Sequence, residues 1–249
     1  MNLEKQIFDK LKPYCNKERA EHDLGYMNTK YELLGCNMPT VRQVAKEVYR
    51  EVDNLDHRTR SKMIDEVWRS SNVFDVLYVC LIYFDNRRGK NDLGDWRLLK
   101  NWSIKIDNWG HSDQLSNIFA DLLDRYPKQI YPMLQHWNKS KLPWQRRLSL
   151  VSLLGYASQR HQFLPVSKIL PLVQFCLTDD HFYVQRAVGW TLRECGHIYP
   201  KEAKAFVKKY ILELSPVAFT TATEKWDQKE KEPLKRVRKA RRATGARRS

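Results

Sequence analysis

Apolar side chains recur every three or four residues along most of this chain, and that interval is the repeat of an α-helix. Alternating apolar and polar runs, which mark β-strands, are hard to find. Proline falls near the start of several periodic segments, where its missing N–H costs nothing, at Pro39, Pro127, Pro143 and Pro200. The pattern predicts an all-α fold, with helices over residues 3–12, 17–34, 39–52, 58–69, 72–84, 95–100, 112–125, 127–137, 143–158, 166–177, 181–196 and 200–211.

Two short echoes suggest that these helices repeat. The triplet Tyr-Pro-Lys at residues 126–128 returns at residues 199–201, each time before an amphipathic segment. Gln-Arg-Arg at Gln145 and Gln-Arg-Ala at Gln185 each begin a helical pattern, about 40 residues apart. Helix pairs of that period predict a solenoid of HEAT-like repeats, a curved stack with a long concave face. Echoes this short also arise by chance, so the repeat is a hypothesis.

Composition limits the class of protein. With 249 residues, of which 42% are hydrophobic, the chain can bury the core of one or two domains. No apolar run approaches the roughly 20 residues of a membrane helix, and the charged N-terminal stretch lacks a signal-peptide core. Five dispersed cysteines without a Cys-x-x-Cys pair argue against a disulfide framework. We expect a monomer in the reduced cytoplasm, at the nucleoid if the source is prokaryotic, with no membrane partner.

Motifs for common cofactors are missing from the sequence. His-Glu-x-x-His does not occur and the seven histidines are scattered, so no metal site has a recognisable ligand spacing. Neither Gly-x-Gly-x-x-Gly nor the P-loop pattern occurs among the nine glycines. The sequence therefore gives no sign of a metal or nucleotide cofactor.

The net charge is +15, and much of it lies at the C-terminal end. Lys229–Ser249 has ten Lys and Arg against two Glu, so it holds +8 and the other residues hold +7. Its low apolar content predicts a flexible basic tail over 229–249, outside a folded domain over 1–228. The tail is either a solubilising end or a segment attracted to a polyanion. Because the body is basic as well, nucleic acid is the leading partner.

The segment DNWGHSD places a tryptophan, Trp109, one helical turn before an aspartate, Asp113. On a helical wheel both lie off the apolar stripe of this helix, which consists of Leu115, Ile118, Phe119, Leu122 and Leu123. The small residues Ser116 and Ala120 are expected to leave room beside Trp109, and the polar residues just before it can cap the helix. The simpler alternative is that Trp109 packs on the adjacent helix and that Asp113 is solvated.

A second tryptophan, Trp190, also lies off the predicted core. The apolar stripe of its helix consists of Val184, Ala187, Val188, Thr191 and Cys195. Trp190 falls on the far side between Arg186 and Arg193, an arrangement that suits a basic surface touching sugars or bases. Gly189 allows another backbone to approach closely. The alternative is that Trp190 packs against a neighbouring repeat and its arginines are solvated.

Arg147 belongs to the segment LPWQRRLSLVSLLGYA. Periodicity does not place it cleanly, because Val151 and Leu154 lie close to its side of the helix. If Arg147 is partly buried there, it needs an anionic partner, either a carboxylate or a phosphate.

Four segments together resemble the AlkD family of alkylpurine DNA glycosylases, in order over about residues 1–209. YMNTKYELLGCNMPTVRQVAKEV, from Tyr26, is similar to the family's N-terminal stretch, NWGHSD matches its Trp-x-x-x-Asp, and WQRR matches its Trp-x-x-Arg. QRAVGWTLRE is the most specific, being close to Gln-Lys-Ala-Ile-Gly-Trp-x-Leu-Arg-Glu. One departure is visible, since relatives often have Trp and Asp where this chain has Asn108 and Gly110. That change puts in question how the lesion strand is held.

The resemblance implies a curved stack of HEAT-like repeats that grips duplex DNA in its concave face. It also implies excision of positively charged alkylated purines, chiefly N3-alkyladenine and N7-alkylguanine. By motif, the expected catalytic residues are Asp113, Trp109 and Trp190. With both arginines beside Trp190 included, the expected DNA-binding residues are Tyr26, Arg147, Arg186 and Arg193.

The chemistry of the reaction supports these roles. Alkylation at N3 or N7 gives the purine a formal positive charge, so the base leaves without being protonated. Cleavage of the glycosidic bond leaves positive charge on the deoxyribose, as an oxocarbenium-like species. A fixed carboxylate such as Asp113 stabilises that charge and orients water, and the indole faces of Trp109 and Trp190 attract the same cation. No metal or nucleotide cofactor is required.

Two other functions also fit the basic helical pattern. A HEAT-like protein could bind damaged or branched DNA without catalysis, although the presence of Asp113 argues against it. A helical scaffold could instead dock an acidic protein partner on its basic face. Salt-sensitive binding to duplex DNA separates this scaffold from the other two functions.

Overall fold

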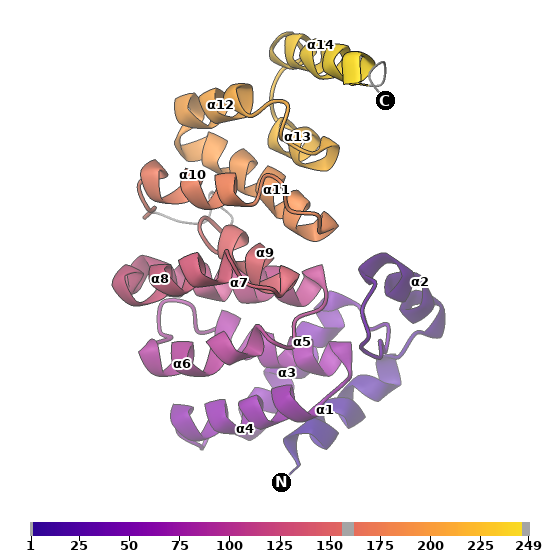
Figure 1. The fold of residues 1–249 in the computed structure, drawn as a ribbon. Helices are drawn as coiled ribbons and strands as arrows, with labels where there is room; N and C mark the ends of the chain where they lie inside the picture. The colour runs from indigo at the N-terminus through magenta and orange to yellow at the C-terminus, as the bar shows by residue number, and fades with distance from the viewer. Residues whose placement is uncertain (1, 156–161, 246–249) are drawn as a thin grey trace. The chain divides into compact units, whose positions relative to one another are not determined.

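The protein is all-α, as the periodicity predicts (Figure 1). The computed structural model describes residues 2–155 and 162–245, and over these residues the only β-type pairing is a parallel bridge between Glu32 and Val73. None of the helices in these ranges has both the length and the apolar character needed to cross a membrane. The helical elements are α1 (Leu3–Leu11), η1 (Lys12–Tyr14), α2 (Lys17–Met27), α3 (Met38–Glu51), α4 (His57–Ser70), α5 (Phe74–Asp85), α6 (Leu93–Trp102), α7 (Trp109–Arg125), α8 (Pro127–Trp137), α9 (Pro143–Val151), α10 (Val166–Phe175), α11 (Phe182–Ile198), α12 (Pro200–Lys209), α13 (Pro216–Ala222) and α14 (Gln228–Gly245).

The helices recur in pairs, which confirms the predicted repeat. Helices α5, α7, α9 and α11 begin at residues 74, 109, 143 and 182, and their partners α4, α6, α8 and α10 begin at residues 57, 93, 127 and 166. The two Tyr-Pro-Lys triplets lie at equivalent helix starts, because Pro127 begins α8 and Pro200 begins α12. Gln145 in α9 and Gln185 in α11 are likewise near the starts of equivalent helices.

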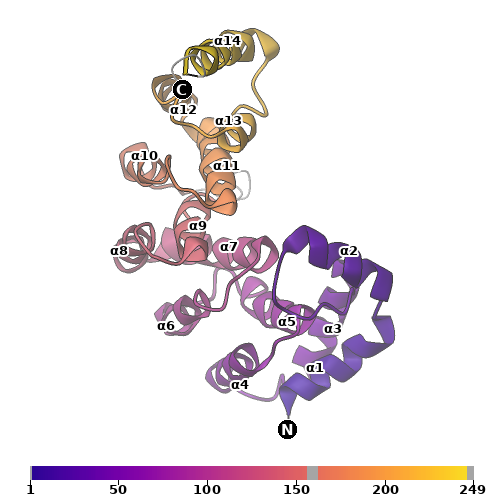
Figure 2. The ribbon, with the colours of Figure 1, turned by 45° about the vertical axis from the view of Figure 1, so that its right-hand side comes forward.

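The chain forms two compact units, residues 1–126 and 127–249. In the first unit α3, α5 and α7 pack in series, while α4 packs on α5 and α6 on α7. Helix α1 packs against α3, α4 and α5, whereas α2 lies to one side of this row and has no buried residue (Figure 2). Helix α5 is the centre of the core, since every residue from Phe74 to Phe84 except Tyr78 is buried.

In the second unit α9, α11 and α13 pack in series, with α8 on α9 and both α10 and α12 on α11. Gly189 lies where α11 meets α13. A Cβ atom at that position would lie 2.6 Å from the carbonyl oxygen of Ala218 and 2.7 Å from Cβ of Thr221. The predicted close approach of another backbone at Gly189 is therefore confirmed.

The helix predicted over residues 17–34 ends early, at Met27. Asn28 adopts a left-handed conformation with φ of 50°, which stops the helix. The segment that follows is held by hydrogen bonds from a distant helix, because the buried carboxylate of Asp75 accepts the N–H groups of Leu34 at 2.8 Å and Cys36 at 3.2 Å. Burial raises the pKa of Asp75. Such long-range bonds leave no periodic signal in the local sequence.

Other helix boundaries differ for local reasons. The helix predicted over 143–158 ends at Val151, and residues 156–158 lie outside the described residues. Helix α13 has seven residues and is too short for a clear period. Helix α14 occupies residues for which the sequence predicts a flexible tail. Its Lys, Arg, Glu and Ala residues favour helix, and its side chains bond to preceding helices. The domain boundary at residue 228 stays a prediction.

Candidate functional site

The start of α7 is fixed by a buried network around His111. Asn108 is the N-cap, and its Oδ1 accepts the backbone N–H of His111 at 2.8 Å. The imidazole donates from Nε2 to the carbonyl of Phe74 at 3.1 Å, stacks on the Phe74 ring at 4.2 Å, and accepts at Nδ1 from the Asn108 amide at 3.0 Å. This cap starts the helix three residues earlier than the period alone predicts, at Trp109.

His111 is fully buried, and its burial lowers the pKa of the imidazole to about 4. The ring is therefore neutral at pH 7, with one nitrogen donating and the other accepting, as its two partners require. The network holds the first turn of α7 rigidly against α5.

Asp107 connects the start of α7 to the segment after α2. Its carboxylate accepts the hydroxyl of Thr29 at 2.6 Å and the backbone N–H of Lys30 at 2.9 Å. Asn108 is thus the helix cap, and Asp107 is the tie between segments. The tie brings Tyr26, at the end of α2, edge-on to Trp109 with ring centroids 5.4 Å apart.

Trp109 and Asp113 lie one turn apart on α7, and both are half-buried. The predicted apolar stripe is confirmed, because all five of its members are buried. Ser116 and Ala120, the small residues expected to leave room beside Trp109, are both buried. Trp109 is therefore a part-exposed ring beside a part-exposed carboxylate, outside the core of its own helix.

The departure from the AlkD pattern beside Trp109 has a structural reason. Asn108 is completely buried as the helix cap. A Cβ atom at Gly110 would lie 3.2 Å from Cζ of Phe74 and 3.4 Å from Oδ1 of Asn108. An aspartate at this position would press on the ring that stacks on His111. Asn108 and Gly110 thus both belong to the network that fixes the helix start.

Trp190 lies on α11 in the second unit and is half-buried, off the core stripe as predicted. The guanidinium of Arg193 lies 5.9 Å from its ring centroid. Arg193 also pairs with Glu224 at 2.7 Å and with Glu194 at 3.1 Å, so its charge is already balanced by two carboxylates. Arg186 is exposed, and over the described residues it has no carboxylate within ion-pair distance. Of the two arginines beside Trp190, Arg186 is the one more available to a phosphate.

Arg147 is 7% exposed, so the structure buries it. Its Nη1–H donates to the carbonyl of Tyr183 at 2.8 Å, which connects α9 to the start of α11. The neighbouring Arg146 pairs with Asp179, and its Nε and Nη2 atoms lie 2.5 Å and 3.0 Å from the two carboxylate oxygens. Little of the Arg147 side chain is left exposed for contact with DNA.

A basic stripe that the sequence analysis missed runs along α3. Arg42, Lys46 and Arg50 are exposed and line a pocket of about 480 Å³. The pocket reaches Gln114 of α7, the residue after Asp113. Spacing of four residues on one helix was the available signal, since side chains at that spacing share a face.

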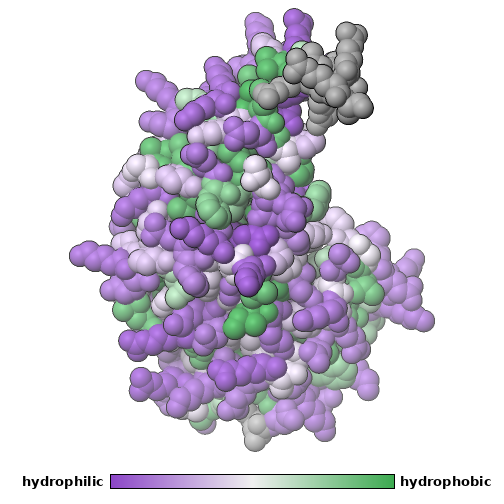
Figure 3. Space-filling model, viewed as in Figure 1, coloured by the Kyte–Doolittle hydropathy of each residue, from purple (hydrophilic) through white to green (hydrophobic). Residues whose placement is uncertain are grey.

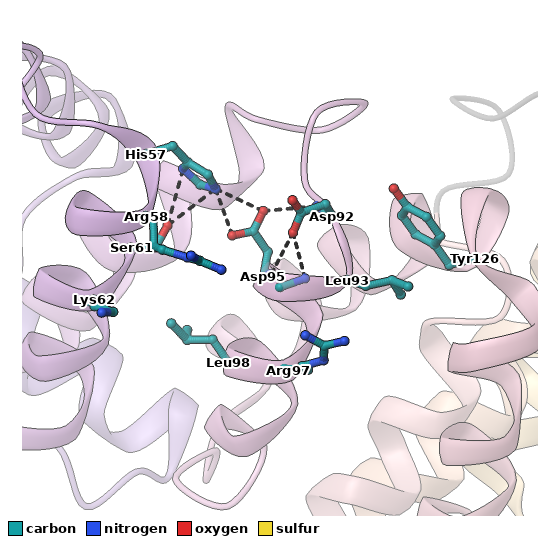
Figure 4. A pocket seen from close by; sticks show the side chains of 11 residues that line it. His57, Arg58, Ser61, Lys62, Asp92, Leu93, Asp95, Arg97, Leu98 and Tyr126 are labelled. Carbon is teal, nitrogen blue, oxygen red and sulfur yellow. Dashed lines mark hydrogen bonds and ion pairs between the residues drawn. The ribbon is translucent and has the colours of Figure 1, made fainter.

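A second pocket in the first unit, of about 670 Å³, lies between α4 and α6 (Figure 4). Inside it His57 bonds through Nε2 to Asp95 at 2.9 Å and through Nδ1 to the Tyr83 hydroxyl at 2.9 Å. The Ser61 hydroxyl lies 3.3 Å from Nδ1, so the order Ser–His–Asp resembles a hydrolase triad. Ser61 is buried and both imidazole nitrogens are occupied, so the network joins three helices and offers no nucleophile. Exposed cations line the same pocket: Arg58, Lys62 and Arg97.

Comparisons with solved structures show the fold. A predicted DNA alkylation repair enzyme from Enterococcus faecalis has a TM-score of 0.73 at 17% identity, covering 86% of this chain and 97% of that chain. AlkD2 from Streptococcus mutans has a TM-score of 0.58 at 19% identity, covering 84% and 99%. The alkylpurine DNA glycosylase AlkC from Pseudomonas fluorescens, bound to DNA containing an abasic site analog, has a TM-score of 0.54 at 13% identity, covering 89% and 60%.

Sequence comparisons address the family. A search of curated proteins finds no match. A family model described as DNA alkylation repair enzyme matches residues 7–226, from within α1 to beyond α13. That match covers most of the chain, and it includes Trp109, Asp113 and Trp190. The chain belongs to the family of DNA alkylation repair enzymes.

Proposed function

We propose that this protein is an alkylpurine DNA N-glycosylase, which hydrolyses the glycosidic bond of cationic purines such as N3-alkyladenine and N7-alkylguanine in duplex DNA. One observation carries the proposal. Trp109 and Asp113 stand one turn apart, both part-exposed, on a helix start that Asn108 and His111 fix from within the core. A rigid carboxylate beside an aromatic face is the arrangement that a developing sugar cation needs.

Asp113 has two tasks in the proposed reaction. As the bond between the sugar and the cationic base breaks, positive charge moves onto the deoxyribose, and the carboxylate stabilises it. The same carboxylate orients a water molecule toward the anomeric carbon and accepts its proton as the new C–O bond forms. The base departs as a neutral purine, so no general acid is required at the leaving group.

The aromatic residues hold the sugar in this scheme. Trp109 presents its indole beside Asp113, with its orientation supported by the edge of Tyr26. Trp190 of the second unit, with the exposed Arg186 next to it, is proposed as a separate contact to DNA.

Trp109→Ala and Trp190→Ala should each raise the activation free energy of base release by ~1–3 kcal/mol. The rate should then fall by a factor of about 5 to 150. Thermal stability should change little, because both rings are half-buried and lie off their core stripes. Trp109→Phe and Trp190→Phe keep an aromatic face and should recover much of the rate. Single-turnover excision measures the change in rate, and thermal melting measures the change in stability. Large losses of stability in both alanine variants, without the loss of rate, would support the simple packing role.

The basic stripe of α3 is proposed to follow the phosphates of one DNA strand toward Asp113. Changing Arg42, Lys46 and Arg50 together to glutamine should flatten the slope of log affinity against log salt by roughly 2 to 3, since each phosphate contact contributes about 0.9. The measurement is duplex binding over a series of salt concentrations.

The pocket between α4 and α6 supplies the matched control for this experiment. Changing Arg58, Lys62 and Arg97 to glutamine removes the same charge from the same unit but from other helices. Their loss should leave the salt slope nearly unchanged. Equal slopes for the two triple variants would mean that charge acts diffusely and that α3 is no phosphate track.

Two measurements separate the proposed function from its alternatives. Release of free base from duplex DNA that contains N7-methylguanine distinguishes a glycosylase from a non-catalytic DNA-binding protein. Salt-sensitive duplex binding distinguishes both from a scaffold for proteins. On the face shown in Figure 3, hydrophilic side chains predominate and hydrophobic ones form small scattered patches, which favours a polyanion over an apolar protein partner.

A further inference from the structure

Helix α14 lies beyond the residues that the family model matches, yet it is attached to the second unit. The main attachment is Arg238. Its Nη1 donates to the carbonyl oxygens of Ile211 at 2.6 Å and Leu214 at 2.7 Å, and its guanidinium lies 4.8 Å from the ring centroid of Phe219. The two carbonyls belong to the turn between α12 and α13. Arg238 therefore ties α14 to that turn and to α13.

The first turns of α14 are attached as well. Asp227 caps the helix by accepting the N–H of Glu230 at 2.8 Å. The Glu230 carboxylate pairs with Lys204 of α12 at 2.5 Å, and Lys231 donates to the carbonyl of Glu224 at 3.2 Å. With Arg238, these bonds fix both ends of the segment 230–238 on the second unit.

The attachment gives α14 two distinct faces. Glu230, Lys231, Leu234 and Arg238 recur at helical spacing and are all part-buried. The exposed positions opposite them include four cations and one carboxylate, Glu232, which pairs with Lys235. The exposed cations are Lys229, Lys235, Arg236 and Lys239. Figure 3 shows hydrophilic side chains standing out from the surface along this end of the chain.

We propose that α14 is a pre-positioned docking surface for the phosphate backbone of duplex DNA, with Arg238 as the residue that positions it. The charge of its exposed face is complementary to the phosphates, whose density on duplex DNA is about one charge per 1.7 Å of axis. A helix that is already docked loses little conformational freedom on binding, whereas a flexible tail would lose much. The proposal rests on the proposed function for its choice of DNA as partner.

Arg238→Gln and Arg236→Gln form a matched pair of variants in the full-length chain. Each variant removes one positive charge, and the two positions lie two residues apart on α14. Of the two side chains, only Arg238 bonds to the turn between α12 and α13. Arg236→Gln should weaken binding to undamaged duplex about threefold at low salt, as the loss of one phosphate contact does. Arg238→Gln should weaken it roughly tenfold or more and should speed hydrogen exchange of the α14 amides, because the exposed cations are no longer held in place.

A fourfold variant tests the exposed face as a whole. Lys229, Lys235, Arg236 and Lys239 are changed to glutamine while the anchor is kept, which should lower duplex affinity on the order of 100-fold at low salt. Unchanged affinity in this variant would overturn the proposal and leave an acidic protein as the partner to test. Equal affinities for Arg238→Gln and Arg236→Gln would also overturn it, because the segment would then act as a diffuse polycation.

The same variants keep this proposal separate from the glycosylase assignment. Base release at saturating protein should be unchanged in the fourfold variant, since Trp109, Asp113 and Trp190 are untouched. If the wild-type protein releases no base but the duplex affinities behave as described, the glycosylase assignment fails and the role of α14 stands. If base is released but the variants bind duplex DNA as tightly as the wild-type protein, the role of α14 fails and the glycosylase assignment stands.

Discussion

Asp113→Asn should lower the rate of base release about 30- to 1000-fold while leaving duplex affinity nearly unchanged. The amide has the size of the carboxylate but no charge, so it neither stabilises the sugar cation nor accepts a proton from water. The range corresponds to a loss of roughly 2–4 kcal/mol of transition-state stabilisation. Single-turnover excision and equilibrium binding on the same oligonucleotide measure the two effects separately.

Asp124→Asn is the control for this variant. It removes one carboxylate from the same helix, eleven residues further along, and it is also part-buried. Its excision rate should stay within a few-fold of the wild-type rate. Near-wild-type excision by Asp113→Asn would contradict the catalytic assignment, and an equal loss of rate in both variants would point to the net charge of α7 instead.

Protonation of His111 should destabilise the fold as the pH falls from 6.5 to about 4. Its pKa is lowered from 6.5 to about 4 by burial, against the opposing effects of the Phe74 carbonyl and Asp107, while Lys105 lowers it further. Between these two values the unfolded chain binds the proton and the folded chain does not, so stability is complete above 6.5 and is lost on acidification. Neutral, buried His111 thus contributes ~3 kcal/mol to the free energy of unfolding above pH 6.5, and this contribution is lost below pH 4. Denaturant unfolding at a series of pH values measures it.

His111→Gln should remove this part of the pH dependence, since the amide can donate to the Phe74 carbonyl without titrating. His136→Gln replaces an exposed histidine and is the control for the loss of an imidazole. His181, whose pKa burial also lowers, contributes in the same direction in all three proteins. An NMR titration of the His111 ring gives the answer even if the variant is poorly folded. A midpoint near 6.5 in the native protein would contradict the lowered pKa of His111.

The helical class and most helix positions are readable from the sequence because the apolar period of each helix matches the face it buries. The stripes of α7 and α11 are examples, since every predicted member is buried. Hydrogen bonds between segments far apart in the sequence explain the early end of α2 and the attachment of α14, neither of which the sequence predicts. Asp75 of α5 and Asp107 in the loop before α7 hold the segment after α2 by hydrogen bonds. Arg238 attaches a helix whose own apolar content is low.

The candidate site is readable only in part. The off-core positions of Trp109 and Trp190 follow from periodicity and are found. The burial of Arg147 and the double pairing of Arg193 depend on the side chains that neighbouring helices bring to them. Local sequence holds no record of those neighbours. The basic stripe of α3 was present in the sequence but becomes meaningful only because its pocket reaches Gln114.

The proposed function depends on cleavage of a glycosidic bond by this chain. The most direct measurement is release of free N7-methylguanine from a duplex containing it, by purified wild-type protein, with Asp113→Asn and buffer alone in parallel. Wild-type protein should form free base and an abasic site well above the spontaneous rate, and Asp113→Asn should form far less of both. Release at the spontaneous rate by wild-type protein that saturates the same duplex would contradict the proposed function and leave a DNA-binding protein without glycosylase activity.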